Sequence, residues 1–312
     1  MKSYVNIHDL GKVSEAIKEA ITLKENPHSH PILGKHKTLV MLFFNASLRT
    51  RLSTEKAARN LGMDVMVLNI SDAWNLEYED GTMMNLNTAE HVKEAARVIS
   101  QYADIIAIRA FPSLIDKQKD EAEQVLTNFE KYATAPIVNL ESATAHPLQA
   151  FADAITIEEF KTRKRPKVVL SWAPHPKALP QSVANSFVRM MTELDVEFSI
   201  AHPKGYELCP KITEGVPMHY DQEEALKNAD FVYTKNWSSY SEYGQVLATD
   251  TNWMITQKKL GKAKFMHCLP VRRNVVVEDG VLDGENSIVI EQANNRTYAA
   301  QFVLKNILEN LS

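Results

Sequence analysis

The sequence of 312 residues contains only two cysteines, Cys209 and Cys268. Two thiols are too few for a disulfide framework or a cysteine-rich metal site, and they suit a reducing compartment. Long hydrophobic runs are also missing, since the longest, such as residues 39–44, are far shorter than the roughly 20 residues of a membrane-spanning helix. Residues 1–10 lack the apolar core of a signal peptide. These absences predict a cytoplasmic protein that does not enter a membrane.

The sequence has no excess of positive charge. It carries 35 Lys and Arg against 39 Asp and Glu, a formal net charge of −4, and no basic stripe with interleaved aromatic residues. This balance argues against nucleic acid as a partner. Two kinds of glycine-rich phosphate loop are absent as well, because the chain contains neither a Walker Gly-Lys-Thr nor a G-x-G-x-x-G motif.

Short apolar runs alternate with helical patterns along most of the chain. Nine runs are predicted strands: residues 38–44, 64–70, 104–110, 136–140, 167–172, 196–201, 231–234, 264–267 and 287–291. This alternation predicts α/β domains with parallel, doubly wound sheets, and the length predicts two domains because one usually holds ~100–200 residues. We place the domains at residues 1–140 and 141–295, with a final helix at 296–312 that returns to the first domain.

The residues after the first predicted strand favour binding of an anion. Ligands of parallel sheets bind beyond the carboxyl ends of the strands, and this end carries Ser47-Leu48-Arg49-Thr50-Arg51 before a helical run. Ser47 occupies the position of an N-cap, so free N–H groups, the helix dipole, two hydroxyls and two arginines would all attract negative charge. The alternative is an ordinary serine cap beside two surface arginines.

Two further strand ends carry polar residues of the same kind. Arg109 closes the third predicted strand, and His146 and Gln149 follow the fourth. If each residue is considered alone, Arg109 is explained by a surface salt bridge and His146 by a helix cap. Their recurrence at successive strand ends predicts instead a single anion site.

Three motifs together make the sequence resemble the aspartate/ornithine carbamoyltransferase family. They are Ser-x-Arg-Thr-Arg at residues 47–51, His-Pro-x-Gln at 146–149, and His-Cys-Leu-Pro at 267–270. The resemblance implies that the first domain binds carbamoyl phosphate and that no metal or other cofactor is needed. The implied contacts are Ser47, Leu48 (through its backbone), Arg49, Thr50, Arg109, His146, Gln149 and Arg296. Among them, Thr50, Arg109, His146 and Gln149 would act on the carbamoyl group as catalytic residues.

Lys235 departs from the pattern of the ornithine enzymes in this family. Those enzymes carry an Asp there, which accepts the free α-ammonium of ornithine, followed by a Ser-Met-Gly that this sequence also lacks. A lysine would repel an ammonium and attract a carboxylate or an amide carbonyl. The sequence therefore resembles the acylornithine branch, whose substrate has an acylated α-nitrogen. The alternative is that Lys235 is solvated and another residue accepts the ammonium.

The acylornithine branch implies the remaining site residues. The expected substrate contacts are Trp74, Ala89, His175, Lys235, Cys268, Leu269 and Arg272. Trp74 would reach into the active site of a neighbouring subunit of a homotrimer, and the second domain would be knotted.

The acyl group is predicted from Ala89. Acetyl-preferring members carry Glu at this position, and a small neutral residue favours a succinyl group, which has a second carboxylate. We therefore expect carbamoyl transfer to N-succinylornithine, giving N-succinylcitrulline in arginine biosynthesis. A shift of the alignment by one residue, onto Glu90, would favour N-acetylornithine. An ornithine carbamoyltransferase and a non-catalytic carbamoyl phosphate-binding paralogue are the weaker alternatives.

Overall fold

The computed structural model describes residues 1–70, 75–248 and 250–311. The chain divides into two compact units, unit 1 with residues 1–113, 118–148 and 296–312, and unit 2 with residues 114–117 and 149–295. Both crossings of the chain between units 1 and 2 near residues 148 and 295 fall inside helices, α6 (Pro147–Phe160) and α12 (Val289–Leu311). Within the described residues, no helix is long and apolar enough to cross a membrane.

Unit 1 is built on a four-stranded parallel sheet in the order β2-β1-β5-β6. The strands are β1 (Thr38–Phe43), β2 (Asp64–Asn69), β5 (Ile105–Arg109) and β6 (Ile137–Glu141). The three strands β1, β5 and β6 are almost wholly buried, whereas the edge strand β2 alternates between exposed and partly buried residues. Strands that are buried on both faces have nearly continuous apolar sequences, which made these strands predictable.

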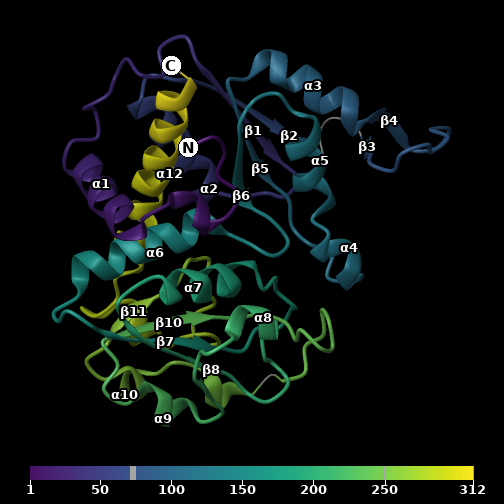
Figure 1. Ribbon diagram of the computed structural model, residues 1–312. Coiled ribbons are helices and arrows are strands. Elements are labelled where there is room, and N and C mark those ends of the chain that lie inside the picture. Colours follow the sequence, from purple (N-terminus) through teal and green to yellow (C-terminus); the bar gives the residue numbers. More distant parts are fainter. Residues whose placement is uncertain (71–74, 249, 312) are drawn as a thin grey trace. The chain divides into compact units, whose positions relative to one another are not determined.

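Helices cover both faces of this sheet. On one face, α3 (Val92–Tyr102) and α5 (Gln124–Tyr132) contribute to a core with residues of β1, β5 and β6. Figure 1 shows α1 (Val13–Glu25), α2 (Arg49–Asn60) and α12 on the other side. A 3₁₀-helix (Ile7–Leu10), the short helix α4 (Lys117–Glu121) and a two-stranded parallel sheet of β3 (Asn75–Glu77) and β4 (Thr88–His91) complete this part of the chain.

Unit 2 repeats the architecture with a five-stranded parallel sheet in the order β11-β10-β7-β8-β9. The strands are β7 (Lys167–Trp172), β8 (Glu197–Ala201), β9 (Met218–His219), β10 (Phe231–Lys235) and β11 (Lys264–Met266). Its helices besides α6 are α7 (Ser182–Thr192), α8 (Pro210–Thr213), α9 (Gln222–Leu226), α10 (Gln257–Leu260) and α11 (Asp279–Leu282), with a 3₁₀-helix at Thr251–Trp253. The prediction of two parallel-sheet α/β domains is confirmed, while the knot stays a prediction.

The predicted strand at residues 287–291 is wrong. Ser287 forms only an isolated bridge to Phe265, and α12 begins at Val289. The β-branched run favoured a strand by local propensity. The helix forms because one side of it is buried, at Gln292, Asn295 and Ala299, and tertiary burial overrides a weak local preference. Strands β3, β4 and β9 were not predicted, because they are two to four residues long and lack apolar alternation.

A buried hydrogen-bonded chain fastens α2 to α12 inside unit 1. Asn60 Nδ2 donates to Gln301 Oε1 at 2.9 Å, and Gln301 Nε2 donates to the carbonyl of Pro27 at 2.7 Å. Gln301 is fully buried and Asn60 nearly so. Further along α12, Lys305 Nζ donates to Glu19 of α1 at 2.9 Å. The last helix of the chain is therefore an integral part of the first unit.

Replacement of one partner in this chain is expected to destabilise unit 1. Gln301→Leu leaves a buried amide of Asn60 without its acceptor, and we expect a loss of about 1–3 kcal/mol in the free energy of unfolding. Urea unfolding of the two single variants and of the double variant Asn60→Leu/Gln301→Leu measures the coupling. The double variant should lose less than the sum of the single losses; strict additivity would show that the two side chains do not interact.

Candidate active site

The turn between β1 and α2 presents a helix N-terminus at the carboxyl edge of the first sheet. Ser47 Oγ accepts a hydrogen bond from the backbone N–H of Thr50 at 3.3 Å, which is the contact of an N-cap, although the helix proper begins at Arg49. Leu48 between them has helical backbone angles and an exposed side chain. Only the backbone of Leu48 is therefore suited to a polar ligand, and the N–H groups of this first turn favour an anion.

Arg296 of α12 reaches the same turn. Its Nη2 donates to Thr50 Oγ1 at 2.5 Å, and both side chains are buried. A residue near the end of the chain is thus brought beside the first strand-helix junction. The structure places together the four predicted residues of this turn and Arg296.

Arg109, the last residue of β5, is buried and fixed from three sides. Its Nη1 donates to the backbone carbonyls of Asn45 and Ala46 at 2.9 and 2.7 Å, and its guanidinium lies 4.0 Å from the ring centre of Phe111. Its Nη2 lies 3.2 Å from Glu141 Oε2. The buried Nε has no hydrogen-bond partner among the described residues, and such a donor is expected to meet a ligand or a water.

The charge of Arg109 is only partly balanced. Burial lowers the pKa of its guanidinium, the neighbouring Glu141 opposes this, and the like charge of Arg49 lowers the pKa further. Two guanidinium groups that repel each other are stabilised by a shared anion. The electrostatics of this edge therefore favour a ligand with more than one negative oxygen.

Glu141 is a buried member of the site that the sequence analysis did not assign. A shift in register between β5 and β6 pairs Arg109 with Glu141, whereas the preceding Ile108 pairs with Asn139. Glu141 Oε2 also lies 3.5 Å from His146 Nε2. One carboxylate thus faces both predicted donors, Arg109 and His146. An acidic residue at a strand end, between an arginine and a histidine, was the available signal.

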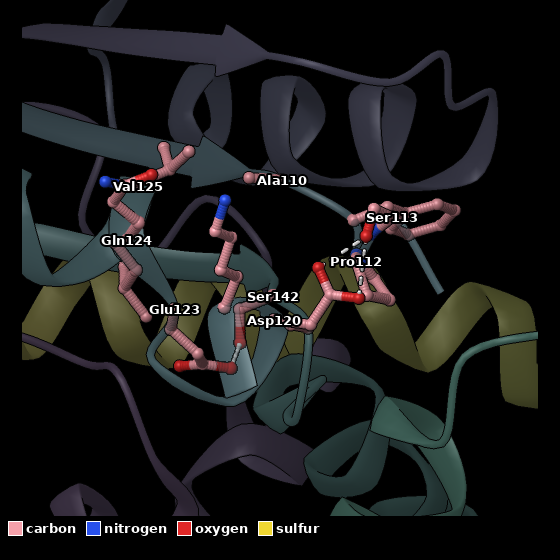
Figure 2. Close-up of a pocket in the computed structure, with 12 residues that line it drawn as sticks. Ala110, Pro112, Ser113, Asp120, Glu123, Gln124, Val125 and Ser142 are labelled. Atoms are coloured by element: carbon pink, nitrogen blue, oxygen red, sulfur yellow. Dashed lines mark hydrogen bonds between the residues drawn. The ribbon is translucent and has the colours of Figure 1, made fainter. Parts of the chain in front are cut away.

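The loop that carries His146 is held by Glu123. This residue has left-handed backbone angles, and its Oε1 accepts from Ser142 Oγ, from the backbone N–H of Thr144 and from Thr144 Oγ1 at 2.6–2.7 Å. Figure 2 shows Glu123 and Ser142 on the wall of a cavity of about 270 Å³ in unit 1. The cavity is lined by Ala110, which follows Arg109 at the end of β5. It is also lined by Ser142, which follows β6 in the loop that leads to His146.

Unit 2 gathers positive charge at the carboxyl ends of its own strands. Arg272 Nε donates to His175 Nε2 at 3.0 Å, and His175 Nδ1 lies 2.8 Å from the carbonyl of Lys177. Burial lowers the pKa of His175, and the charges of Arg272, Lys235 and Lys177 lower it further, against the opposing hydrogen bond to the carbonyl. His175 is therefore a neutral imidazole that orients Arg272, and this cluster favours carboxylate groups.

Lys235 closes β10 and is partly buried, with its Nζ donating to the carbonyl of Asn236 at 3.1 Å. Arg273, next to Arg272, instead pairs with Asp279 and Asp283 at 3.0 and 2.7 Å. Of the two adjacent arginines, only Arg272 contacts the cluster of His175.

The other predicted residues lie in three different settings. Cys268 is buried, and Leu269 has a positive φ of 54° while its N–H donates to His267 Nδ1 at 2.8 Å. Ala89 is exposed on β4, with Glu90 on the opposite face of that strand. Trp74 lies outside the described residues. Among the described residues, no group of three or more His, Cys, Asp or Glu side chains is suited to hold a metal ion.

Two family models match the chain. The carbamoyl-P binding domain of aspartate/ornithine carbamoyltransferase matches residues 2–159, and the Asp/Orn binding domain matches residues 180–307. An N-succinylornithine carbamoyltransferase of Bacteroides fragilis (strain 638R) is 48% identical over 317 residues, which cover 100% of each chain. An N-acetylornithine carbamoyltransferase of Xanthomonas axonopodis pv. citri (strain 306) is 33% identical and covers 97% of this chain and 96% of its own.

Solved structures agree with these relatives. A mutant of N-acetyl-L-ornithine transcarbamylase complexed with PALAO has a TM-score of 0.92 at 33% identity and covers 98% of this chain and 100% of its own. A glutamate-to-valine mutant of N-acetyl-L-ornithine transcarbamylase, complexed with carbamyl phosphate and N-succinyl-L-norvaline, has a TM-score of 0.91 at 33% identity with the same coverage.

The pairing of His175 with Arg272 predicts a measurable titration. The imidazole should titrate below the ordinary value of about 6.5, and Arg272→Gln should raise the midpoint because a neighbouring positive charge is removed. Burial remains, so the return should be incomplete. NMR titration of the assigned His175 signal measures both, with Arg163→Gln, which alters a pair with Asp230 elsewhere in unit 2, as the control. A midpoint that Arg272→Gln leaves unchanged would contradict the assigned contact.

Proposed function

The chain belongs to the aspartate/ornithine carbamoyltransferase family, and on this basis we propose that it transfers the carbamoyl group of carbamoyl phosphate to the side-chain amine of N-succinylornithine. The products are N-succinylcitrulline and phosphate, and the reaction serves arginine biosynthesis. The observation that carries the first half of this proposal is the buried, partly unbalanced Arg109 beside the N-terminus of α2.

The phosphate of carbamoyl phosphate suits the first turn of α2. Its oxygens would accept hydrogen bonds from Ser47, the backbone N–H of Leu48, Arg49 and Thr50. Arg296 supports this turn by donating to the hydroxyl of Thr50. Arginine side chains bind phosphate through paired hydrogen bonds, and the helix N-terminus adds a favourable dipole. These contacts support binding of a dianion and stabilise phosphate as it leaves.

The side chains of Thr50, Arg109 and His146 would donate hydrogen bonds to the carbamoyl oxygen. The neutral amine nitrogen attacks the carbamoyl carbon, a C–N bond forms, and negative charge develops on the oxygen. The C–O bond to phosphate then breaks, its electron pair leaves with phosphate, and the departing phosphate takes the proton that the amine nitrogen loses. Donors that are fixed before the reaction stabilise the developing charge, and loss of one such donor costs about 3–4 kcal/mol in comparable enzymes. Glu141 would keep Arg109 and His146 in place.

The amine substrate suits the positive cluster of unit 2. N-succinylornithine carries two carboxylates and no free α-ammonium, and Lys235, Arg272 and the neutral His175 offer two positive charges and a hydrogen-bonding ring. The backbone carbonyls of Cys268 and Leu269 would accept from the attacking amine. A free α-ammonium would be repelled by this cluster, which argues against ornithine.

Ala89 supports a succinyl rather than an acetyl group. It is small, neutral and exposed, so it leaves room for a second carboxylate. The 48% identical relative is an N-succinylornithine enzyme. The acetylornithine enzyme, by comparison, was crystallised with N-succinyl-L-norvaline as glutamate-to-valine, glutamate-to-alanine and glutamate-to-serine mutants. N-acetylornithine remains the second candidate because acetylornithine enzymes are 33% identical over 97% of the chain.

We also propose a homotrimer with shared active sites, in which Trp74 reaches a neighbouring subunit, and a cytoplasmic location. The family resemblance supports the trimer. The two cysteines, both without a disulfide, suit a reducing compartment. Sedimentation of the active protein tests the assembly, and a fully active monomer would exclude shared sites.

Phosphate release with three amines tests the function. N-succinylornithine, N-acetylornithine and ornithine are supplied at equal concentration with carbamoyl phosphate, and kcat/KM is measured for each. We expect turnover to be fastest with N-succinylornithine. Preference for the acetyl substrate would select the second candidate, and no release with any of the three would indicate a non-catalytic paralogue.

Arg49→Ala is expected to weaken binding of carbamoyl phosphate. A hydrogen bond to a charged group contributes about 1.5–3 kcal/mol, so KM for carbamoyl phosphate should rise about 10- to 100-fold. Arg59→Ala is the matched control, because Arg59 lies at the other end of α2 and pairs with Glu55 in an exposed position. Saturation by carbamoyl phosphate that is unchanged in a folded Arg49→Ala variant would refute the assignment.

Ala89→Glu is expected to shift preference toward N-acetylornithine. A glutamate facing the succinyl carboxylate at about 4 Å is repelled by roughly 4 kcal/mol at an effective dielectric constant of 20, whereas an acetyl group carries no charge. The ratio of kcat/KM for the succinyl and acetyl substrates should therefore fall by more than about tenfold. Glu90→Gln tests the alternative alignment. If the wild type prefers the acetyl substrate and Glu90→Gln reverses this preference, Ala89 was misplaced.

A further inference from the structure

Glu123 departs from two local rules at the start of α5. It is the N-cap residue of that helix, yet its backbone lies in the left-handed region, with φ and ψ both 47°. Within the described part of the chain, its side chain makes no hydrogen bond that caps the helix. N-cap residues usually have extended backbone angles and accept from the first turn, and the left-handed region disfavours side chains other than those of Asn and Asp. The needs of α5 therefore do not explain Glu123, and such departures concentrate at functional sites.

The side chain of Glu123 instead reaches the turn at residues 142–145, which follows β6. Its Oε1 accepts from Ser142 Oγ at 2.6 Å, from the backbone N–H of Thr144 at 2.7 Å and from Thr144 Oγ1 at 2.7 Å. Figure 2 shows Glu123 beside Ser142. Hydrogen bonds to a charged oxygen are short and strong, and three of them on one atom fix the middle of this turn to the start of α5.

The turn transmits this constraint to His146. The backbone N–H of Ser142 donates to the carbonyl of Ala145 at 2.8 Å, and Ala145 directly precedes His146. At its other end the turn follows Glu141, which is held in the sheet by its pairing with β5. The sheet thus fixes the point at which the chain leaves β6, and Glu123 fixes its course from there to His146.

We propose that Glu123 is a positioning residue for carbamoyl transfer, which holds His146 where its ring donates to the carbamoyl oxygen. This inference rests on the proposed function, in which His146 is one of the donors, and it names the residue that sets the position of that donor. Donors stabilise developing charge best when they are fixed before the reaction. A displacement of about 1 Å can lower the rate about 100-fold. A carboxylate on a separate helix, with three hydrogen bonds to the turn, provides the required fixation.

The experiment measures kcat for carbamoyl transfer to N-succinylornithine in folded variants. Glu123→Asn suits the left-handed backbone but has a shorter side chain that does not reach the turn, so kcat should fall at least about tenfold. Glu123→Gln keeps an acceptor oxygen at the same reach and should keep kcat within about threefold of the wild type. Asp9→Ala is the matched control, because Asp9 also accepts two backbone N–H groups in unit 1, those of Val5 and Asn6. This control should leave kcat unchanged.

A double-mutant cycle with His146→Ala separates positioning from a general loss of stability. If Glu123 acts through His146, Glu123→Asn should lower kcat by less than about threefold once His146 is already replaced. The inhibition constant of inorganic phosphate provides a second comparison, because phosphate would bind the first turn of α2 rather than His146. This constant should stay within about threefold of the wild-type value in Glu123→Asn, and a larger rise would show that Glu123 acts on the phosphate end instead.

If Glu123→Asn does not fold, Glu123→Gly carries the same expectation, because glycine adopts left-handed backbone angles freely. An unchanged kcat in the folded variant, an equal fall in Asp9→Ala, or independent losses in the double variant would overturn the role of Glu123. Hydrogen exchange of the Thr144 amide tests the contacts without substrate and should be at least about tenfold faster in Glu123→Asn. Equal exchange would overturn the role of Glu123 alone, whereas absence of carbamoyl transfer in the wild type would overturn the proposed function.

Discussion

The site in unit 1 depends on the burial of one positive charge. Arg109 ends a strand in the interior, where a guanidinium is stable only with acceptors around it. The fold supplies the carbonyls of Asn45 and Ala46 and the carboxylate of Glu141. These partners do more than neutralise charge, because they connect the end of β5 to the turn before α2 and to the end of β6. Arg109 is thus the residue through which three strand ends are held in one arrangement.

The two units apply one architecture to two different chemical tasks. In each, a parallel sheet brings strand ends to a common edge, and the loops there carry the polar residues. Unit 1 combines a helix N-terminus with arginines, which suits a phosphate. Unit 2 combines Lys235 and Arg272 with a neutral histidine, which suits carboxylates. The proposed reaction uses both kinds of residue, because it joins an acyl phosphate to an amine substrate whose other charged groups are negative.

The sequence predicted the strands of the two cores and the residues at their ends, because buried parallel strands and helix caps have strong local patterns. It did not predict the start of α12, where burial of one face outweighs β-branched residues, or the role of Glu141. That role arises from a register shift between β5 and β6, which no local pattern encodes. The hydrogen bond from Gln292 to Asp153 was also missed, because these two residues are 139 apart in the chain.

The path of the chain through α12 has a consequence for synthesis of the protein. The ribosome makes residues 149–295, which belong to unit 2, before it makes residues 296–312, which belong to unit 1. The unit that begins first is therefore finished last, because Arg296 and Gln301 are made only after the residues of unit 2. Domains usually fold in order from the N-terminus during translation. In this protein, unit 2 can fold while unit 1 still exposes the surface on which residues 296–312 pack.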